Sequence, residues 1–259
     1  MGVINLTPDS FFENSRAPGI QEAVETAGRM IQEGAEILDL GAMSTRPGAE
    51  EINAATELER LIPALWSIRQ AFPGTFISVD TYRSQVAREA AGNGADMIND
   101  ISGGSFDEEM FDAIAELSLP YVLMHTGGKP KTMQDNPVYS NVLEDVRFFF
   151  EHNIGILHSK GISQVILDPG FGFGKTIEHN YRLLAGLSVF RIMGHPVMVG
   201  VSRKSLINKI LNTAPGNALN GTTVLNTIAL MNGADILRVH DVKEAVQCRM
   251  LVKAYREYG

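Results

Sequence analysis

Polar and charged side chains recur along this 259-residue chain at the points where short apolar runs end. Asp80, Asn99 and Asp168 each close such a run, and Arg238 and His240 close the last one. Carboxylates and amides can form paired hydrogen bonds with a flat, nitrogen-rich ring. Arginine binds phosphate groups through two parallel hydrogen bonds. These residue types therefore predict a site for a ligand with a polar ring at one end and a polyanion at the other.

Further polar residues occupy equivalent positions after other apolar runs. They are Asn5, Ser44-Thr45-Arg46, His125 and Arg203-Lys204. Each residue taken alone is also typical of a helix cap, because a strand end leads into a helix start. Their recurrence after every apolar run favours one shared site, in which Arg46 and Lys204 join Arg238 and His240 as groups that suit an anion.

The apolar runs that precede these residues are short and rich in β-branched side chains, and they alternate with longer helical patterns. We expect strands at 2–6, 36–41, 76–80, 95–100, 120–125, 164–168, 196–201 and 235–239. This alternation predicts an α/β protein with parallel strands and crossover helices. Eight such units over residues 1–259 predict one domain, a (β/α)8 TIM barrel whose active site lies at the C-terminal ends of the strands. The alternative is a doubly wound open sheet.

Helical spacing of apolar residues predicts amphipathic helices at 53–72, at 141–160 and after Asp241. Pro63 falls inside the first helix and is expected to kink or split it. The only cysteine, Cys248, falls in the last helix and is expected to behave as a small core side chain.

Composition narrows the range of partners. The formal net charge of −8 argues against a nucleic-acid or membrane-surface binder, although it is compatible with a small anionic substrate. No apolar run approaches the roughly 18 residues of a membrane span, and a single cysteine excludes an intrachain disulfide. We therefore expect a cytoplasmic protein. The chain begins directly on the first expected strand, so we expect either that residues are missing before Met1 or that the floor of the barrel is partly uncovered there.

The segment from Asp168 to Thr176, DPGFGFGKT, comes close to a nucleotide-binding P-loop. The match fails at its first glycine, where Pro169 can supply neither a backbone N–H group nor a positive φ. A tight glycine turn beneath a planar ligand is the better interpretation, with Phe173 packing on that ligand. Lys175 is expected at the surface or at the start of the following helix.

Taken together, the motifs MGVINLTPDSF, STRPG, SVDT, IND, LMH, DPGFGFGK, SRKS and RVHD resemble those of the dihydropteroate synthase family in order and spacing. The resemblance extends from residue 1 to about residue 245. It implies the condensation of 6-hydroxymethyl-7,8-dihydropterin diphosphate with para-aminobenzoate, which yields 7,8-dihydropteroate and pyrophosphate in folate biosynthesis. It also implies a Mg²⁺ cofactor, a homodimer formed through the late helices, and sulfonamides as mimics of aminobenzoate.

The resemblance also implies roles for individual residues. The pterin pocket would contain Asp80, Asn99, Met124, Asp168, Phe173 and Lys204. The pyrophosphate would be bound by Asn5, Arg46, Arg238 and His240, with Asn5 also meeting the magnesium ion. The aminobenzoate would be bound by Phe11, Thr45, Pro47, Lys204 and Ser205. The groups expected to act in catalysis are Asp80, Lys204, Arg238, His240 and Arg46.

The mechanism that this arrangement favours is an SN1-like displacement, in which the electron-rich pterin ring supports a cation as pyrophosphate departs. Two other functions share the pterin pocket: a methyltransferase domain that carries methyl-tetrahydrofolate to a corrinoid protein, and a binding module without chemistry. The STRPG motif and the pair Arg238 and His240 argue against the first. The complete set of polar residues argues against the second. Met43, before the STRPG motif, and the loop after Ser10 depart from the usual family pattern.

Overall fold

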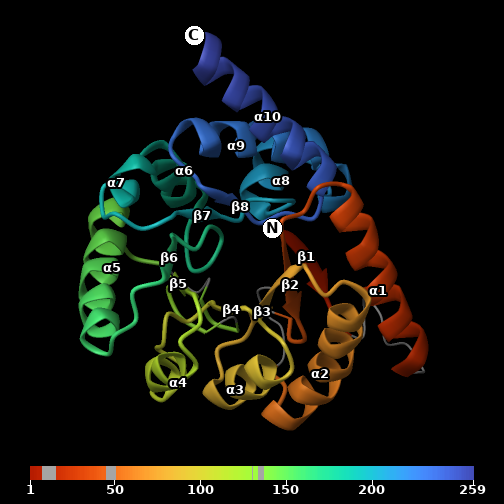
Figure 1. Ribbon diagram of the computed structural model, residues 1–259. Coiled ribbons are helices and arrows are strands. Elements are labelled where there is room, and N and C mark those ends of the chain that lie inside the picture. Colours follow the sequence, from red (N-terminus) through yellow and green to blue (C-terminus); the bar gives the residue numbers. More distant parts are fainter. Residues whose placement is uncertain (8–15, 45–50, 130, 134–136) are drawn as a thin grey trace.

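The computed structural model describes residues 1–7, 16–44, 51–129, 131–133 and 137–259. Within these residues, short parallel strands alternate with helices around one axis (Figure 1). The strands are β1 (Gly2–Asn5), β2 (Ile37–Gly41), β3 (Phe76–Asp80), β4 (Met97–Asp100), β5 (Tyr121–Met124), β6 (Val165–Asp168), β7 (Met198–Val199) and β8 (Ile236–Leu237). Each lies inside a predicted run. β7 and β8 are much shorter than expected.

Strand pairing follows the chain order. β1 to β6 form one parallel sheet, and β7 pairs with β8. Single parallel bridges join the two sheets at both edges, Leu167 with Val197 and Gly2 with Val239. The eight strands therefore surround one axis as a (β/α)8 TIM barrel, and the open-sheet alternative is wrong. Parallel strands bring all their C-terminal ends to one rim, which is the physical reason why the predicted polar residues can meet.

Helices surround the strands on the outside (Figure 1). They are α1 (Arg16–Gln32), α2 (Ala54–Ala71), α3 (Ser84–Gly92), α4 (Met110–Leu117), α5 (Val142–Ser159), α6 (Ile177–Ala185), α7 (Ser188–Arg191), α8 (Ser205–Leu211), the short 3-10 helix η2 (Pro215–Asn217), α9 (Leu219–Met231) and α10 (Val242–Tyr258). Buried residues of the strands and of the inner helix faces, such as Leu38, Leu65 and Phe150, form the main core between the two layers.

The predicted helices are confirmed as α2, α5 and α10. α2 is not split at Pro63: the helix runs through it, and the Ser67 hydroxyl donates to the Pro63 carbonyl oxygen at 2.8 Å. Cys248 is buried in α10, as expected. Among the described residues, no helix is both long and apolar enough to cross a membrane.

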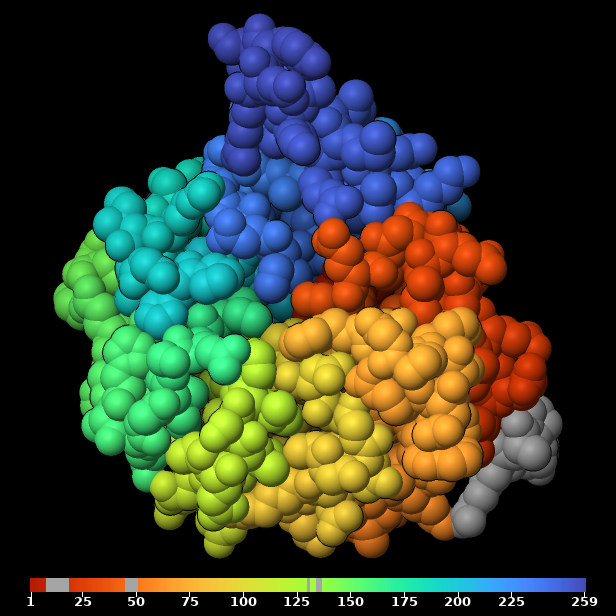
Figure 2. Space-filling view, viewed as in Figure 1, coloured from red at the N-terminus to blue at the C-terminus, as the bar shows by residue number. Residues whose placement is uncertain are grey.

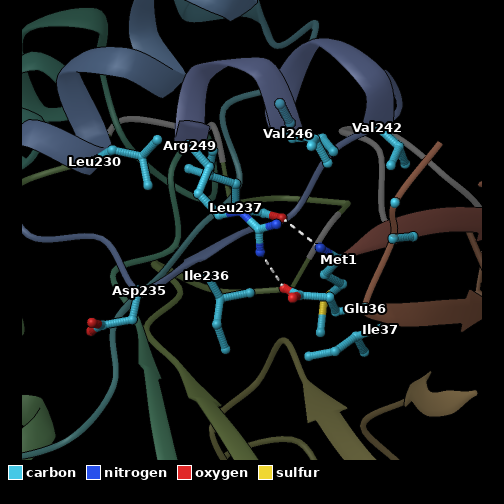
Figure 3. A pocket seen from close by; sticks show the side chains of 14 residues that line it. Met1, Glu36, Ile37, Leu230, Asp235, Ile236, Leu237, Val242, Val246 and Arg249 are labelled. Atoms are coloured by element: carbon cyan, nitrogen blue, oxygen red, sulfur yellow. Dashed lines mark hydrogen bonds and ion pairs between the residues drawn. The ribbon is translucent and has the colours of Figure 1, made fainter. Parts of the chain in front are cut away.

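A small cavity of about 90 Å³ lies at the floor of the barrel, beside the N-terminal ends of β1, β2 and β8 (Figure 3). Leu230, Val242 and Val246 contribute apolar walls, and Glu36 pairs with Arg249 at 2.7 Å across its edge. The polar strand ends lie at the opposite rim, so this cavity is separate from the predicted site.

Candidate active site

A charged network fills the centre of the barrel mouth. The Arg238 guanidinium pairs with Asp39 of β2 at 2.6 Å and with Asp80 at the end of β3 at 2.7 Å. Arg238 follows β8, so this network ties together strands from both sheets. Asp39 and Asp80 are buried, and a buried carboxylate requires such a partner because its desolvation is costly.

Asn99 extends the network along the same face of the sheet. Its side-chain amide nitrogen donates to the Asp39 carboxylate at 3.1 Å. The amide therefore turns its carbonyl oxygen away from Asp39. That oxygen, and the second carboxylate oxygen of Asp39, are buried and have no hydrogen-bond partner in the described part of the chain. Two buried acceptors without donors indicate a place where a ligand rich in N–H groups fits.

Lys204 approaches the same space from the loop that follows β7. Its ammonium group donates to the Phe171 carbonyl oxygen at 2.7 Å and lies 4.8 Å from the centre of the Phe173 ring. Asp168 closes β6 beside it and accepts the Gly170 backbone N–H at 2.8 Å. The glycine turn thus brings a lysine, a carboxylate and an aromatic ring together after the end of β6.

An apolar cluster lies beside these groups. Met124, Phe173 and Met43 belong to it, and its other buried members are Tyr82, Ile101 and Met133. These side chains come from the loops and strand ends that follow β2 to β6. Met124 and Phe173 therefore share one apolar cluster near the C-terminal ends of the strands, and their contact with a pterin stays a prediction.

A second polar group comes from the loops after β7 and β8. His240 is exposed at the mouth, and its Nδ1 atom lies 3.0 Å from the Ser202 hydroxyl. Asn5 ends β1, the strand beside β8, and its side chain has no partner among the described residues. Ser205 is exposed at the first position of α8. These groups surround the charged centre and can contact an anion that enters the mouth.

Burial controls the protonation of these groups. It raises the pKa of Asp80 to about 7, an effect that Arg238 opposes and Asp39 reinforces. It also raises the pKa of Asp168, against the influence of Lys204, and it lowers the pKa of Lys204 to about 8. Burial disfavours the charged form of Arg238 too, but Asp39 and Asp80 outweigh it and raise the Arg238 pKa. Carboxylates with raised pKa values beside fixed cations are typical of a binding or catalytic centre.

Two sequence predictions differ from the structure. Lys175 lies directly before Thr176, the N-cap of α6, as one alternative predicted, but it is not at the surface. Its ammonium group contacts His125 Nδ1 at 3.0 Å and the carbonyl oxygens of His125, Gly170 and Phe173 at 3.0 to 3.2 Å. His125 does not join the site. Its ring packs edge-on against Phe149 of α5, with ring centres 5.0 Å apart, and so faces away from the barrel axis.

Four predicted site residues, Phe11, Thr45, Arg46 and Pro47, lie outside the described residues. Two described residues of the site, Asp39 and Ser202, were not predicted from the sequence. The alternation of side chains along a strand could have predicted Asp39. Ile37, Asp39 and Gly41 lie on one face of β2, and that face leads to the C-terminal end of the strand. No such signal points to Ser202, whose partner His240 is 38 residues away.

Comparison with known proteins agrees with this geometry. The family described as "Pterin binding enzyme" matches residues 1–240. A curated dihydropteroate synthase of Escherichia coli K12 is 46% identical over 256 residues, covering 98% of this chain and 90% of that protein.

Solved structures of dihydropteroate synthases are also similar to this chain. A Yersinia pestis dihydropteroate synthase with a sulfonamide drug complex superimposes with a TM-score of 0.91 at 42% identity, covering 99% of this chain and 94% of that one. A Xanthomonas albilineans dihydropteroate synthase with 4-aminobenzoic acid gives a TM-score of 0.92 at 36% identity, covering 100% and 93%. The fold and site thus define a pterin-binding barrel enzyme. Within that class, the chain belongs to the dihydropteroate synthases, transferases of folate synthesis.

Proposed function

We propose that the pterin ring of the substrate binds between Asp80, Asn99, Asp168 and Lys204, with Met124 and Phe173 against its apolar surface. The observation that carries this placement is the pair of unpartnered buried acceptors on Asn99 and Asp39. A pterin presents a guanidine-like edge with several N–H donors, which matches acceptors of this kind. Relatives support the proposal, since solved structures of the Xanthomonas albilineans dihydropteroate synthase carry 4-aminobenzoic acid in one case and 7,8-dihydropteroate in another.

The diphosphate of the substrate is proposed to lie over Arg238, His240 and Asn5, with Arg46, which follows β2 in the sequence. An amide oxygen such as that of Asn5 suits Mg²⁺, which commonly takes one or two protein ligands and completes its shell with substrate phosphates and water. Asn5 would hold the ion, and the chemistry that Mg²⁺ supplies when bound is neutralisation of charge on the leaving group.

The reaction is proposed to be dissociative. The carbon–oxygen bond to pyrophosphate breaks first, and the bond between that carbon and the aminobenzoate nitrogen forms second, with loss of one proton from nitrogen. Arg238 stabilises the negative charge that develops on the leaving oxygen, and the carboxylates of Asp80 and Asp168 stabilise the positive charge left on the ring system. The amine is neutral near pH 7, so no strong general base is required.

The aminobenzoate is proposed to bind against Phe11, Thr45, Pro47, Lys204 and Ser205. Lys204 would then lie between the two substrates, which its position 4.8 Å from the centre of the Phe173 ring supports. Sulfonamides that mimic aminobenzoate are expected to compete for this position.

The experiment that tests the function follows pyrophosphate release and dihydropteroate formation together, with and without Mg²⁺. Simultaneous appearance of both products, dependent on Mg²⁺, is the expected result. Pterin binding without either product would instead favour a binding module. Calorimetry with Lys204→Ala tests the placement of the ring: we expect weaker pterin binding than for Lys209→Ala, an exposed change on the helix that Lys204 precedes.

A homodimer is also proposed. The late helices expose large apolar side chains at helical spacing, namely Val224, Ile228 and Met231 on α9 and Met250, Leu251, Tyr255 and Tyr258 on α10. The C-terminal part of α10 stands out from the body of the protein (Figure 2). Light scattering of the wild type and of Leu251→Lys tests this: a dimer that the lysine dissociates is expected, and a monomeric wild type would contradict it. The cytoplasmic location stays a prediction.

A further inference from the structure

The loops that follow β7 and β8 are tied together by side chains. Arg203 pairs with Asp241 through two hydrogen bonds, at 2.9 and 2.7 Å. Next to this pair, the Ser202 hydroxyl lies 3.0 Å from His240 Nδ1 and accepts the His240 backbone N–H at 3.2 Å. Both contacts of the Ser202 hydroxyl are thus made to one residue. Ser202 is 4% exposed, so water has little access to it.

The hydrogen-bonding capacity of a hydroxyl limits how these two residues can pair. Its oxygen already accepts the backbone N–H of His240, and its single proton needs an acceptor. The described residues offer one acceptor within reach, the Nδ1 atom of His240. A ring nitrogen that accepts a hydrogen bond carries no proton, and a neutral imidazole then carries its proton on Nε2.

The surroundings keep the imidazole neutral. Partial burial of the ring lowers the pKa of His240 to about 4, helped by the cations Arg238, Arg203 and Lys204 and opposed by Asp241. The rest of the ring is exposed at the barrel mouth, and Nε2 has no partner in the described part of the chain. The Nε2–H group is therefore available to a ligand, in the field of the nearby Arg238 charge.

We propose that Ser202 is a positioning residue that holds His240 as the Nε2–H tautomer, so that this N–H donates to the departing pyrophosphate. The choice of pyrophosphate as the acceptor of this hydrogen bond rests on the function proposed above. His240 then adds a neutral donor to the anion site, where a third positive charge would repel Arg238 and Lys204. A neutral His240 also does not transfer a proton to the departing pyrophosphate.

The tautomer can be measured without any substrate. Nitrogen-15 labelling of histidine in the full chain, followed by long-range proton–nitrogen correlation spectra, distinguishes Nδ1–H from Nε2–H. The chain has 6 histidines, and the His240 signal is identified as the one lost in His240→Gln. We expect Nε2–H in the wild type, a mixture of both tautomers in Ser202→Ala, and the wild-type pattern again in Ser202→Thr, which keeps the hydroxyl.

Binding of inorganic pyrophosphate provides the second readout. Ser202→Ala is expected to weaken it about twofold, because a roughly equal mixture leaves about half of the protein with the Nε2–H tautomer, and to have no further effect in a His240→Gln background. The KM for aminobenzoate should stay the same, and circular dichroism confirms that the variants fold. A wild-type Nδ1–H or charged ring would overturn the inference, as would a tautomer change without loss of pyrophosphate binding. Absence of product with the wild type would overturn the proposed function alone.

Discussion

The buried Lys175 makes a quantitative prediction possible. Its ammonium group contacts three backbone carbonyl oxygens and the His125 ring in the space between the loops after β5 and β6. Burial lowers its pKa from 10.5 to about 7, against the attraction of Asp168. An unfolded chain exposes the same lysine, whose pKa then returns to about 10.4.

The sign of the pH effect follows from proton binding. Between pH 7 and pH 10.5 the unfolded chain binds more protons at this position than the folded protein, so the free energy of unfolding rises with pH across that window. For these two pKa values the rise attributable to Lys175 from pH 7 to pH 9 is about 2 kcal/mol. In Lys175→Met this contribution is absent. The buried carbonyl oxygens also lose a donor, at a cost of about 1 to 3 kcal/mol for each group left without one.

Urea unfolding of the wild type and of Lys175→Met at pH 7, 8 and 9 measures the effect. We expect the wild type to gain stability over the variant by about 2 kcal/mol across this range. Lys209→Met, the same change at an exposed position of α8, is the matched control and should show no such trend. A constant difference between the wild type and Lys175→Met from pH 7 to pH 9 would show that the lysine is not held as described.

Three further predictions concern the turn and the charged centre. Gly170→Ala places a methyl group 1.9 Å from a backbone carbonyl oxygen at a residue with φ +71°. The control Gly161→Ala has a similar φ of +81° but open space around the added carbon. We expect Gly170→Ala to lower the free energy of unfolding by about 1 to 3 kcal/mol more than Gly161→Ala, as measured by thermal unfolding. Asp39→Asn breaks the buried ion pair with Arg238 and should lower the free energy of unfolding in urea by about 3 kcal/mol. Glu36→Gln breaks the exposed pair with Arg249 and should lower it by less than about 1 kcal/mol. Equal losses would contradict the central role of the network. Arg238→Ala should weaken pyrophosphate binding, as measured by calorimetry. Unchanged affinity would show that Arg238 does not bind the pyrophosphate.

Much of the site was predictable because strand position and chemistry coincide. In a parallel barrel every strand ends at the same rim, so Asp80, Asn99 and Asp168 could be assigned to one site from their places after apolar runs. The two-residue alternation of a strand likewise predicts that Arg238 and His240 lie on one face of the last strand. The roles for specific substrates needed the resemblance to a family, because a carboxylate at a strand end does not by itself select a pterin.

The failures share a physical cause. Lys175 was expected at the surface or at a helix start, and His125 was expected in the shared site. Their positions depend on how closely two loops pack: a side-chain carbon at Gly174 would meet Gly127 at 2.6 Å, so little room remains between the loops. The depth of packing between loops distant in sequence has no periodic signature. The same holds for β7 and β8, whose pairing is shorter than their apolar runs.

The sequence by itself determined the alternation of strands and helices, the barrel, and the set of polar groups at its mouth, since these follow from local periodicity and chain order. Only the tertiary structure decided which charges pair. Arg238 engages Asp39, 199 residues away, and His240 engages Ser202, because hydrogen bonds and desolvation depend on distances of a few ångströms between distant segments. Those pairings determine which polar atoms are left for a ligand.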